Sequence, residues 1–258
     1  MNTLFSVEGK VALVTGGAQG MGRMIAEGLV RAGAKVYISS RKVDICQAAV
    51  QELSVLGNCV GLVADLDSPE AVVALVEQFK AHENRLDILV NNAGRTWGAP
   101  FESFPDKAWA PVMAVNVQGP FTLVRELLPS LRSAARADDP ARVINIGSLA
   151  GALVEPISAF SYVASKAALH HLSRVLAAEL APDSITVNTI VPGYFPTKMT
   201  AHIREEQERA SELEARIPLK RLGTAEDIVG LCIFLSSRAG AYVTGSEMSL
   251  DGGMLGCR

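Results

Sequence analysis

The 258-residue sequence has no excess of positive charge, because its 24 Lys and Arg face 27 Asp and Glu and leave a formal net charge of −3. Without a general basic field, neither a nucleic acid nor an anionic membrane is expected as a partner. The sequence also has no uninterrupted apolar run approaching 18 residues and no basic start followed by an apolar segment, so no membrane span or export signal is predicted. We therefore expect a soluble, cytoplasmic protein.

Cysteine and aromatic residues are scarce. The four cysteines, Cys46, Cys59, Cys232 and Cys257, lie far apart and form no CxxC or Cys/His pattern, which argues against a metal site and favours reduced thiols. Aromatic residues make up only 5% of the chain although hydrophobic residues make up 49%. Ala, Val, Leu and Ile therefore supply most of the apolar mass, which suits helices packed on a parallel sheet.

Seven short apolar runs rich in β-branched residues alternate with longer segments of helical periodicity. The runs cover residues 11–14, 36–39, 60–63, 88–90, 143–146, 185–190 and 248–250. This alternation predicts parallel βαβ units with right-handed crossovers, and hence a doubly wound Rossmann-type α/β fold with a seven-stranded parallel sheet flanked by helices. No linker or repeat divides the chain, so we expect a single domain over residues 1–258.

A glycine-rich loop, TGGAQGMG, follows the first run and places Gly16, Gly20 and Gly22 before a helix expected to begin near Gly20. Glycines there permit a tight turn and let backbone N–H groups at the helix N-terminus approach a pyrophosphate. The spacing GxxxGxG differs from the usual dinucleotide fingerprint GxGxxG. A glycine-rich turn without a ligand is the alternative interpretation.

The second run ends in SSRKVD, with Ser40 and Arg41 where an NAD-binding unit usually carries an acidic residue for the ribose 2′-hydroxyl. An arginine fork suits a 2′-phosphate, which favours NADP as the cofactor. The alternative is a solvated arginine at a helix start. Gln19 is neutral where a second basic residue would strengthen the case.

The segment FSYVASKAALH places Tyr162 and Lys166 four residues apart, on one face of a helix. An ammonium beside a phenol favours the phenolate, so we expect Lys166 to lower the pKa of Tyr162 from about 10. The alternative is that two long side chains simply pack together.

Three further polar or glycine-containing motifs also follow predicted strands: NNAG, GSLAG and VPGYFPT come after the fourth, fifth and sixth runs. With the glycine loop they predict a site at the carboxyl edge of the sheet, where such folds bind ligands.

These ordered motifs, with ADL at 64–66, VNV around Asn116 and YVASK at 162–166, resemble those of the short-chain dehydrogenases/reductases over residues 11–253. Within that family the chain is most similar to bacterial NADPH-dependent 3-oxoacyl (β-ketoacyl) reductases of the rhamnolipid-synthesis branch, where NNAG is likewise followed by a Trp-Gly pair. The resemblance implies NADPH-dependent reduction of a small-molecule carbonyl substrate. It also implies a homotetramer or homodimer, with AYVTGSEMSLDGG as the C-terminal strand of the assembly.

The resemblance implies a catalytic set of Asn116, Ser148, Tyr162 and Lys166. In relatives the serine polarises the substrate carbonyl, the tyrosine exchanges a proton with it, the lysine holds the nicotinamide ribose, and the asparagine orders a water. The cofactor contacts implied are Gly16, Gln19, Gly20, Met21, Gly22, Ser40, Arg41, Asp65, Leu66, Asn92, Ala93, Gly94, Tyr162, Lys166, Pro192, Gly193, Phe195 and Thr197. Alternatively, Asp65 caps a turn and Asn92 satisfies a strand end.

The substrate side is expected in the loop after NNAG and in the segment from Tyr194 to Ile217. The candidates for an apolar wall that accepts a hydrophobic ketone are Trp97, Phe101, Tyr194, Phe195 and Met199. The charged run IREEQERASELEAR predicts a solvated amphipathic helix.

Two other functions remain open from the sequence. One is an NAD-dependent polyol or gluconate-type dehydrogenase, against which Arg41 argues. The other is a catalytically silent NADP-binding regulator, which would not need Ser148 or Tyr162.

The charge near two turns bears on how a substrate is delivered. Reductases that take substrates from the acidic acyl carrier protein usually present basic residues at the entrance, whereas this chain has Asp138 and Asp139 in ADDPAR and Asp183 in APDS. The sequence therefore predicts a preference for free ketones or 3-oxo esters. The arginines that could restore a positive patch are Arg132, Arg136, Arg142 and Arg174.

Overall fold

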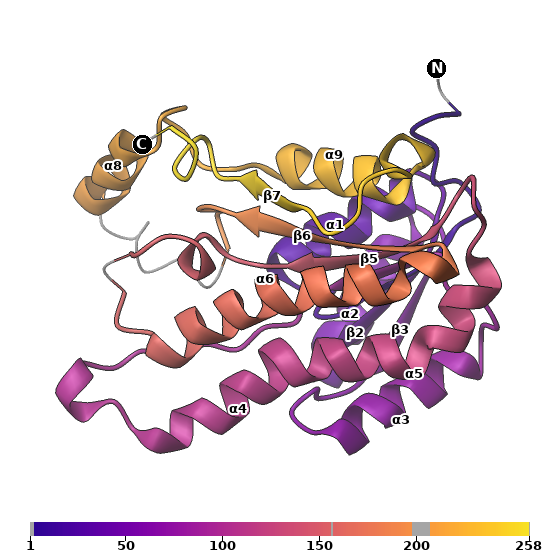
Figure 1. Ribbon diagram of the computed structural model, residues 1–258, viewed down its shortest axis with the longest axis horizontal. Coiled ribbons are helices and arrows are strands. Elements are labelled where there is room, and N and C mark those ends of the chain that lie inside the picture. The colour runs from indigo at the N-terminus through magenta and orange to yellow at the C-terminus, as the bar shows by residue number, and fades with distance from the viewer. Residues whose placement is uncertain (1–2, 156, 198–206, 258) are drawn as a thin grey trace.

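The computed structural model describes residues 3–155, 157–197 and 207–257, and its centre is one sheet of seven parallel strands (Figure 1). The strands are β1 (Val11–Val14), β2 (Lys35–Ser40), β3 (Cys59–Val63), β4 (Ile88–Asn91), β5 (Ala141–Ile146), β6 (Ile185–Pro192) and β7 (Glu247–Leu250). Each apolar run predicted as a strand lies within one of them. The predicted doubly wound fold is thereby confirmed.

Helices cover both faces of the sheet (Figure 1). On one face lie α1 (Gly20–Arg31), α2 (Val43–Ser54) and α9 (Ala225–Ser236), and on the other lie α3 (Pro69–Lys80), α5 (Gly119–Ala134) and α6 (Phe160–Leu180). The short α4 (Trp109–Met113) precedes α5, and α8 (Gln207–Arg216) precedes α9. The described part of the charged run, from residue 207 onward, is therefore helical as predicted.

The strand residues divide between two cores according to the alternation of side chains along a strand. In β1, Ala12 and Val14 pack with α1, α2 and α9, whereas Val11 and Leu13 pack with α3, α5 and α6. All four residues are buried. Burial on both faces explains why the strands read as continuous apolar runs, which made them easy to find in the sequence.

The strand order β3-β2-β1-β4-β5-β6-β7 reverses direction between β1 and β4. The chain runs outward from β1 to β3 and then crosses back to β4, which lies next to β1. The connection after β1 leads toward β2 and the one after β4 leads toward β5, on opposite sides. A crevice opens at such a switch point, outside the carboxyl ends of the strands. The fold thus positions the glycine loop and NNAG beside each other.

A buried ionic cluster occupies the opposite, amino edge of the sheet. The Asp139 carboxylate lies 2.7 Å from Lys10 Nζ and 3.0 Å from Arg142 Nη2. Arg142 is fully buried and also donates to the carbonyl oxygens of Leu235 and Ser237 at 3.0 and 2.9 Å. These contacts satisfy the charges that burial would otherwise penalise.

This cluster corrects the expectation about substrate delivery. Asp138 and Asp139 precede β5, and Asp183 precedes β6, so all three lie at the amino edge, away from the crevice. Asp139 is also held by buried cations, and Asp183 is paired with Arg132 at 2.8 Å. The prediction that these carboxylates weaken docking at the entrance of the site was therefore wrong.

Candidate active site

A cleft of about 600 Å³ runs along the carboxyl edge of the sheet. All of the predicted site residues line it except Gly22 and Asn116. The lining residues that the sequence reasoning did not single out are Ala18, Ser39, Lys42, Ile45, Ala64, Arg95, Val115, Ile146 and Gly147. Most of these are immediate neighbours of the predicted motifs, so the motifs located the site to within a residue or two.

The glycine loop is fixed by Asn92, the second residue of NNAG. The Asn92 amide donates to the carbonyl oxygens of Thr15 and Gly16 at 2.9 and 3.3 Å. A Cβ on Gly22 would lie 2.3 Å from that amide nitrogen and 2.4 Å from the Gly16 oxygen, so no side chain fits there. Gly16 itself has a φ of +64°, which favours glycine. Asn92 thus holds the chain just after β1, where the glycine loop begins, and it also lines the cleft.

Helix α1 begins at Gly20 without a side-chain cap at Gln19 and without an acidic residue in its first turn. Its first N–H groups therefore lack the carboxylate or hydroxyl partners that often satisfy them. This arrangement leaves the amino end of α1 suited to an anion.

Two cations lie at the end of the cleft next to β2. Arg41 follows the strand, is 61% exposed at its side chain, and lies 3.9 Å from the Asp65 carboxylate. Lys42, which precedes the first residue of α2, lines the same cleft. Lys42 therefore adds a second basic residue to the lining of the cleft, in which Gln19 is neutral.

The Tyr162 and Lys166 side chains come together with Ser148 as the motifs predicted. Tyr162 lies in the first turn of α6 and Lys166 in the next. The Ser148 side chain lies close enough to the Tyr162 hydroxyl to act on its pKa through a hydrogen bond, and Lys166 Nζ lies 5.7 Å from the centre of the Tyr162 ring. Lys166 Nζ also donates to the Ile146 carbonyl oxygen at 2.7 Å, so the last residue of β5 anchors the ammonium.

The electrostatics of this group differ from the expectation. Burial raises the pKa of Tyr162, and the hydrogen bond from Ser148 only counters that effect. Burial also lowers the pKa of Lys166 to about 8. The predicted lowering of the Tyr162 pKa by Lys166 was therefore wrong for this structure, because burial dominates the shift and Lys166 is not among the groups that act on it. At neutral pH the phenol keeps its proton and can donate it.

Asn116 lies in a π-helical segment, Ala114–Gln118, between α4 and α5. Such bulges are rare and occur frequently at functional sites. Its amide oxygen accepts the Arg95 backbone N–H at 2.8 Å, and its nitrogen donates to the Arg95 carbonyl oxygen and to Ser165 Oγ, both at 2.9 Å. Asn116 thus joins the loop after NNAG, at Arg95, to α6, at Ser165. The ordering of a water by Asn116 stays a prediction.

The proposed apolar wall is largely absent from the lining of the cleft. Phe101 packs edge-on against Phe160, with ring centroids 5.6 Å apart, and neither Phe101 nor Trp97 lines the cleft. Tyr194 donates its hydroxyl to Glu155 at 2.8 Å. Phe195 does line the cleft, and Met199 lies outside the described residues.

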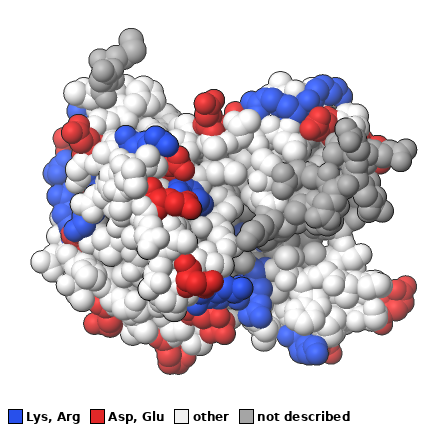
Figure 2. Space-filling view, turned by 180° about the vertical axis from the view of Figure 1, so that it is seen from behind, with Lys and Arg blue, Asp and Glu red and all other residues white. Residues whose placement is uncertain are grey.

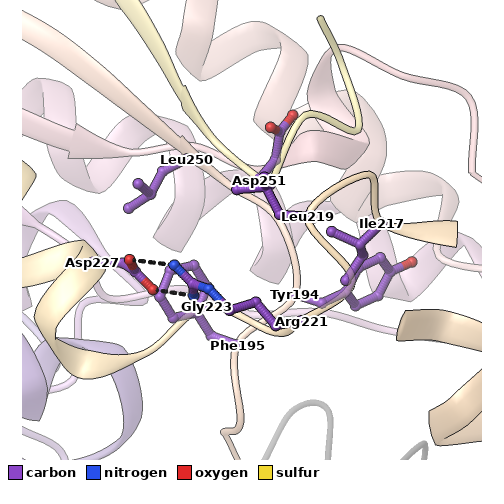
Figure 3. A pocket seen from close by; sticks show the side chains of 10 residues that line it. Tyr194, Phe195, Ile217, Leu219, Arg221, Gly223, Asp227, Leu250 and Asp251 are labelled. Carbon is purple, nitrogen blue, oxygen red and sulfur yellow. Dashed lines mark hydrogen bonds and ion pairs between the residues drawn. The ribbon is translucent and has the colours of Figure 1, made fainter. Parts of the chain in front are cut away.

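Tyr194 and Phe195 also border a smaller hollow of about 80 Å³ (Figure 3). Arg221 and Asp227 face each other across it and form a two-pronged ion pair, with nitrogen to oxygen distances of 2.6 and 2.9 Å. Asp227 also caps α9 through Thr224. Because these charges satisfy each other and hold the start of α9, we interpret this hollow as part of the scaffold.

Neither a patch of like charge on the face shown in Figure 2 nor a metal site offers a second candidate functional site within the described part of the chain. On the face drawn in Figure 2, acidic and basic side chains are interspersed rather than gathered by sign. Residues 3–155, 157–197 and 207–257 contain no group of three His, Cys, Asp or Glu side chains arranged to hold a metal. None of the helices described is long and apolar enough to cross a membrane.

Comparisons with known proteins agree with this geometry. A family model described as "Enoyl-(Acyl carrier protein) reductase" matches residues 16–255. The rhamnolipids biosynthesis 3-oxoacyl-[acyl-carrier-protein] reductase of Pseudomonas aeruginosa is 47% identical over 253 residues, which are 98% of this chain and 99% of that protein. The 5-keto-D-gluconate 5-reductase of Escherichia coli is 37% identical over 256 residues, with 99% of each chain covered.

A solved structure described as the Pseudomonas aeruginosa RhlG/NADP active-site complex superposes with a TM-score of 0.96 at 46% identity. The match covers 99% of this chain and 100% of the other. At this identity and coverage, the likeness extends over the whole sheet and the loops at its carboxyl edge.

Proposed function

Because the chain belongs to the short-chain dehydrogenase/reductase family, we propose that it reduces a ketone to a secondary alcohol with NADPH. The observation that carries this proposal is the meeting of Ser148, Tyr162 and Lys166 in the cleft that the glycine loop also lines. The family resemblance inferred from the motifs is confirmed by the comparisons. The roles of the individual residues are our proposal.

The cleft fits a phosphorylated dinucleotide. Its glycine loop leaves the uncapped start of α1 accessible to a pyrophosphate, and Arg41 and Lys42 supply positive charge for a 2′-phosphate. When bound, NADPH supplies the hydride. The description of one solved relative as an NADP complex supports this choice of cofactor.

The protein's own groups supply the proton and stabilise the charge. The Ser148 hydroxyl donates a hydrogen bond to the substrate oxygen, where negative charge grows as the carbonyl is reduced. Tyr162 then gives this oxygen its phenolic proton. The raised pKa of Tyr162 keeps that proton in place at neutral pH. Lys166, anchored on Ile146, places a positive charge behind the phenol as it becomes phenolate.

The substrate class we propose is a hydrophobic ketone or a 3-oxoacyl derivative. The 47% identity to a 3-oxoacyl reductase over nearly the full length supports this class. A second class, a keto-gluconate, is supported by the 37% identity to 5-keto-D-gluconate 5-reductase. Both are ketone reductions, so they share the same use of Ser148 and Tyr162.

A direct assay separates these candidates. The purified protein is mixed with NADPH or NADH and with ethyl acetoacetate, an acetoacetyl thioester or 5-keto-D-gluconate, and absorbance is followed at 340 nm. We expect turnover of the acetoacetyl compounds with NADPH. Turnover confined to 5-keto-D-gluconate would transfer the assignment to the sugar-acid class. Binding of NADPH without turnover of any carbonyl compound would favour the silent regulator.

We also propose that the chain forms a homotetramer or homodimer. Phe121 on α5 and Val175 on α6 are large apolar side chains that are exposed in the single chain, and Tyr242, just before β7, is fully exposed. Exposed apolar groups on adjacent helices are typical of surfaces that bury against a partner. Light scattering that gave a mass of 27.3 kDa, the mass of one chain, would contradict this.

A further inference from the structure

A buried histidine touches the segment that carries Ser148. His170 lies on α6, one helical turn after Lys166, and is only 3% exposed. Its Nε2 atom accepts the backbone N–H of Ser148 at 3.2 Å. Its Nδ1 atom lies 3.2 Å from the Glu247 carboxylate on β7. His170 does not line the cleft, so any effect on the reaction passes through the residues it holds.

Two glycines allow this contact. A Cβ on Gly147 would lie 2.3 Å from His170 Nε2, and a Cβ on Gly151 would lie 3.0 Å from its Cε1. The chain on both sides of Ser148 is therefore packed directly against the imidazole. The ring belongs to a 21-residue helix, so it is a rigid support for the short loop that carries Ser148. Without the ring, only the turns within that loop would fix the position of Ser148.

The contacts also fix the tautomer of the ring. Nε2 accepts a hydrogen bond, so the proton of the neutral imidazole resides on Nδ1 and is donated to Glu247. The other carboxylate oxygen of Glu247 accepts from Arg174, which lies one turn further along α6. Glu247 therefore orients the ring from the far side, as a carboxylate behind a histidine often does.

We propose that His170 is a positioning residue that, held by Glu247, sets the place of Ser148 for the reaction. This inference rests on the proposed function, because it assumes that Ser148 polarises the substrate. A displacement of about 1 Å in such a donor is enough to cost about 100-fold in rate. The imidazole thus contributes to turnover without touching substrate or cofactor.

The proposal has a pH consequence. Protonation would place a hydrogen on Nε2, and the ring would no longer accept the Ser148 N–H. The charged groups that face it are Glu247 from β7 and Lys166 and Arg174 from α6, whereas residues 147–151 bring none. Burial lowers the pKa of His170, the two cations add to that effect, and Glu247 opposes it. The ring is therefore neutral at pH 7 and loses its hold on Ser148 only in acid.

Three variants test this. His170→Leu removes the acceptor, His170→Gln keeps an acceptor oxygen at about the position of Nε2 but cannot titrate, and His171→Gln is the matched control. His171 is the neighbouring, exposed histidine, whose ring contacts Arg174 at 3.1 Å and not Ser148. We measure kcat for ketone reduction from pH 5 to 8, the dissociation constant of NADPH, and the thermal midpoint of each variant.

We expect His170→Leu to lower kcat at pH 7 by at least about 10-fold, within the range that misplacement of a reacting group costs. The dissociation constant of NADPH should stay within about twofold of the unsubstituted value, because Ser148, which the substitution displaces, contacts the substrate rather than the cofactor. In the unsubstituted protein kcat should fall in acid, below about pH 6.5, the ordinary pKa of histidine. His170→Gln should recover most of the rate at pH 7 and show no such fall, because glutamine does not titrate. His171→Gln should behave as the unsubstituted protein.

The inference is overturned if His170→Leu keeps a normal kcat, or if His170→Gln shows the same acid fall as the unsubstituted protein. Ser148→Ala separates this failure from that of the proposed function. If Ser148→Ala also keeps a normal kcat, the proposed role of Ser148 is wrong. If it loses rate while His170→Leu does not, only the positioning role of His170 is wrong.

Discussion

Arg41 offers the sharpest test of cofactor choice. In our account its guanidinium binds the 2′-phosphate of NADPH, a group that NADH lacks. A charge-assisted hydrogen bond contributes about 1.5–3 kcal/mol, but the Arg41 side chain is 61% exposed, so we take the lower end because solvent screens exposed charges. A loss of about 1.4 kcal/mol corresponds to a tenfold change in binding. We therefore expect Arg41→Ala to weaken NADPH binding about tenfold and NADH binding by less than about twofold.

The assay for this prediction is a titration of both cofactors with fluorescence detection, alongside Michaelis constants for each. Arg31→Ala is the matched control, since Arg31 is an arginine of similar exposure, paired with Glu27 at the far end of α1. The control should leave both affinities unchanged. Equal weakening of NADPH and NADH by Arg41→Ala would show that Arg41 only packs against the turn, and would refute its proposed contact with the phosphate.

Three further predictions concern the loop, the scaffold and the lysine. Gly22→Ala should raise the Michaelis constants of NADPH and NADH alike, because its Cβ would lie 2.4 Å from a backbone oxygen of the glycine loop; unchanged constants for both would contradict the packing argument. Asp139→Asn should destabilise the fold by about 3 kcal/mol in a denaturant titration, since it removes the charge that pairs the buried Lys10 and Arg142; kcat at 25 °C should persist. Ketone reduction should slow as pH rises through about 8, where Lys166 loses its proton, and a rate that stayed flat from pH 7 to 9.5 would exclude a need for the charged lysine.

The fold and the location of the site were predictable because they rest on local patterns. Strands buried on both faces leave continuous apolar runs, such as the one at Val11–Val14, and these alternate with amphipathic helices. The order of the motifs then placed four loops at one edge of the sheet. The glycines at 16 and 22 could be read from the sequence because each has a local reason to be glycine: Gly16 has a positive φ, and a Cβ on Gly22 would lie 2.4 Å from the Gly16 oxygen.

The features that the sequence did not reveal depend on distance along the chain and on burial. His170 and Glu247 are 77 positions apart and meet only because β7 pairs beside β6. The expected pKa of Tyr162 was wrong because the adjacent Lys166 was visible in the sequence, whereas the burial that dominates the shift was not. The sequence likewise does not distinguish an aspartate in an ion pair from a solvated one in the same turn, whereas the structure shows Asp139 paired with Lys10.

The central claim, that Tyr162 donates the proton to a reduced ketone, is tested most directly by Tyr162→Phe. This change removes one oxygen from a half-buried ring that packs beside Lys166, so the fold and the cleft should persist. We predict that NADPH binds within about twofold of the unsubstituted affinity and that kcat for ethyl acetoacetate falls by at least about 100-fold, the lower end of what a positioned acid supplies. A kcat within about threefold of the unsubstituted protein would contradict the account.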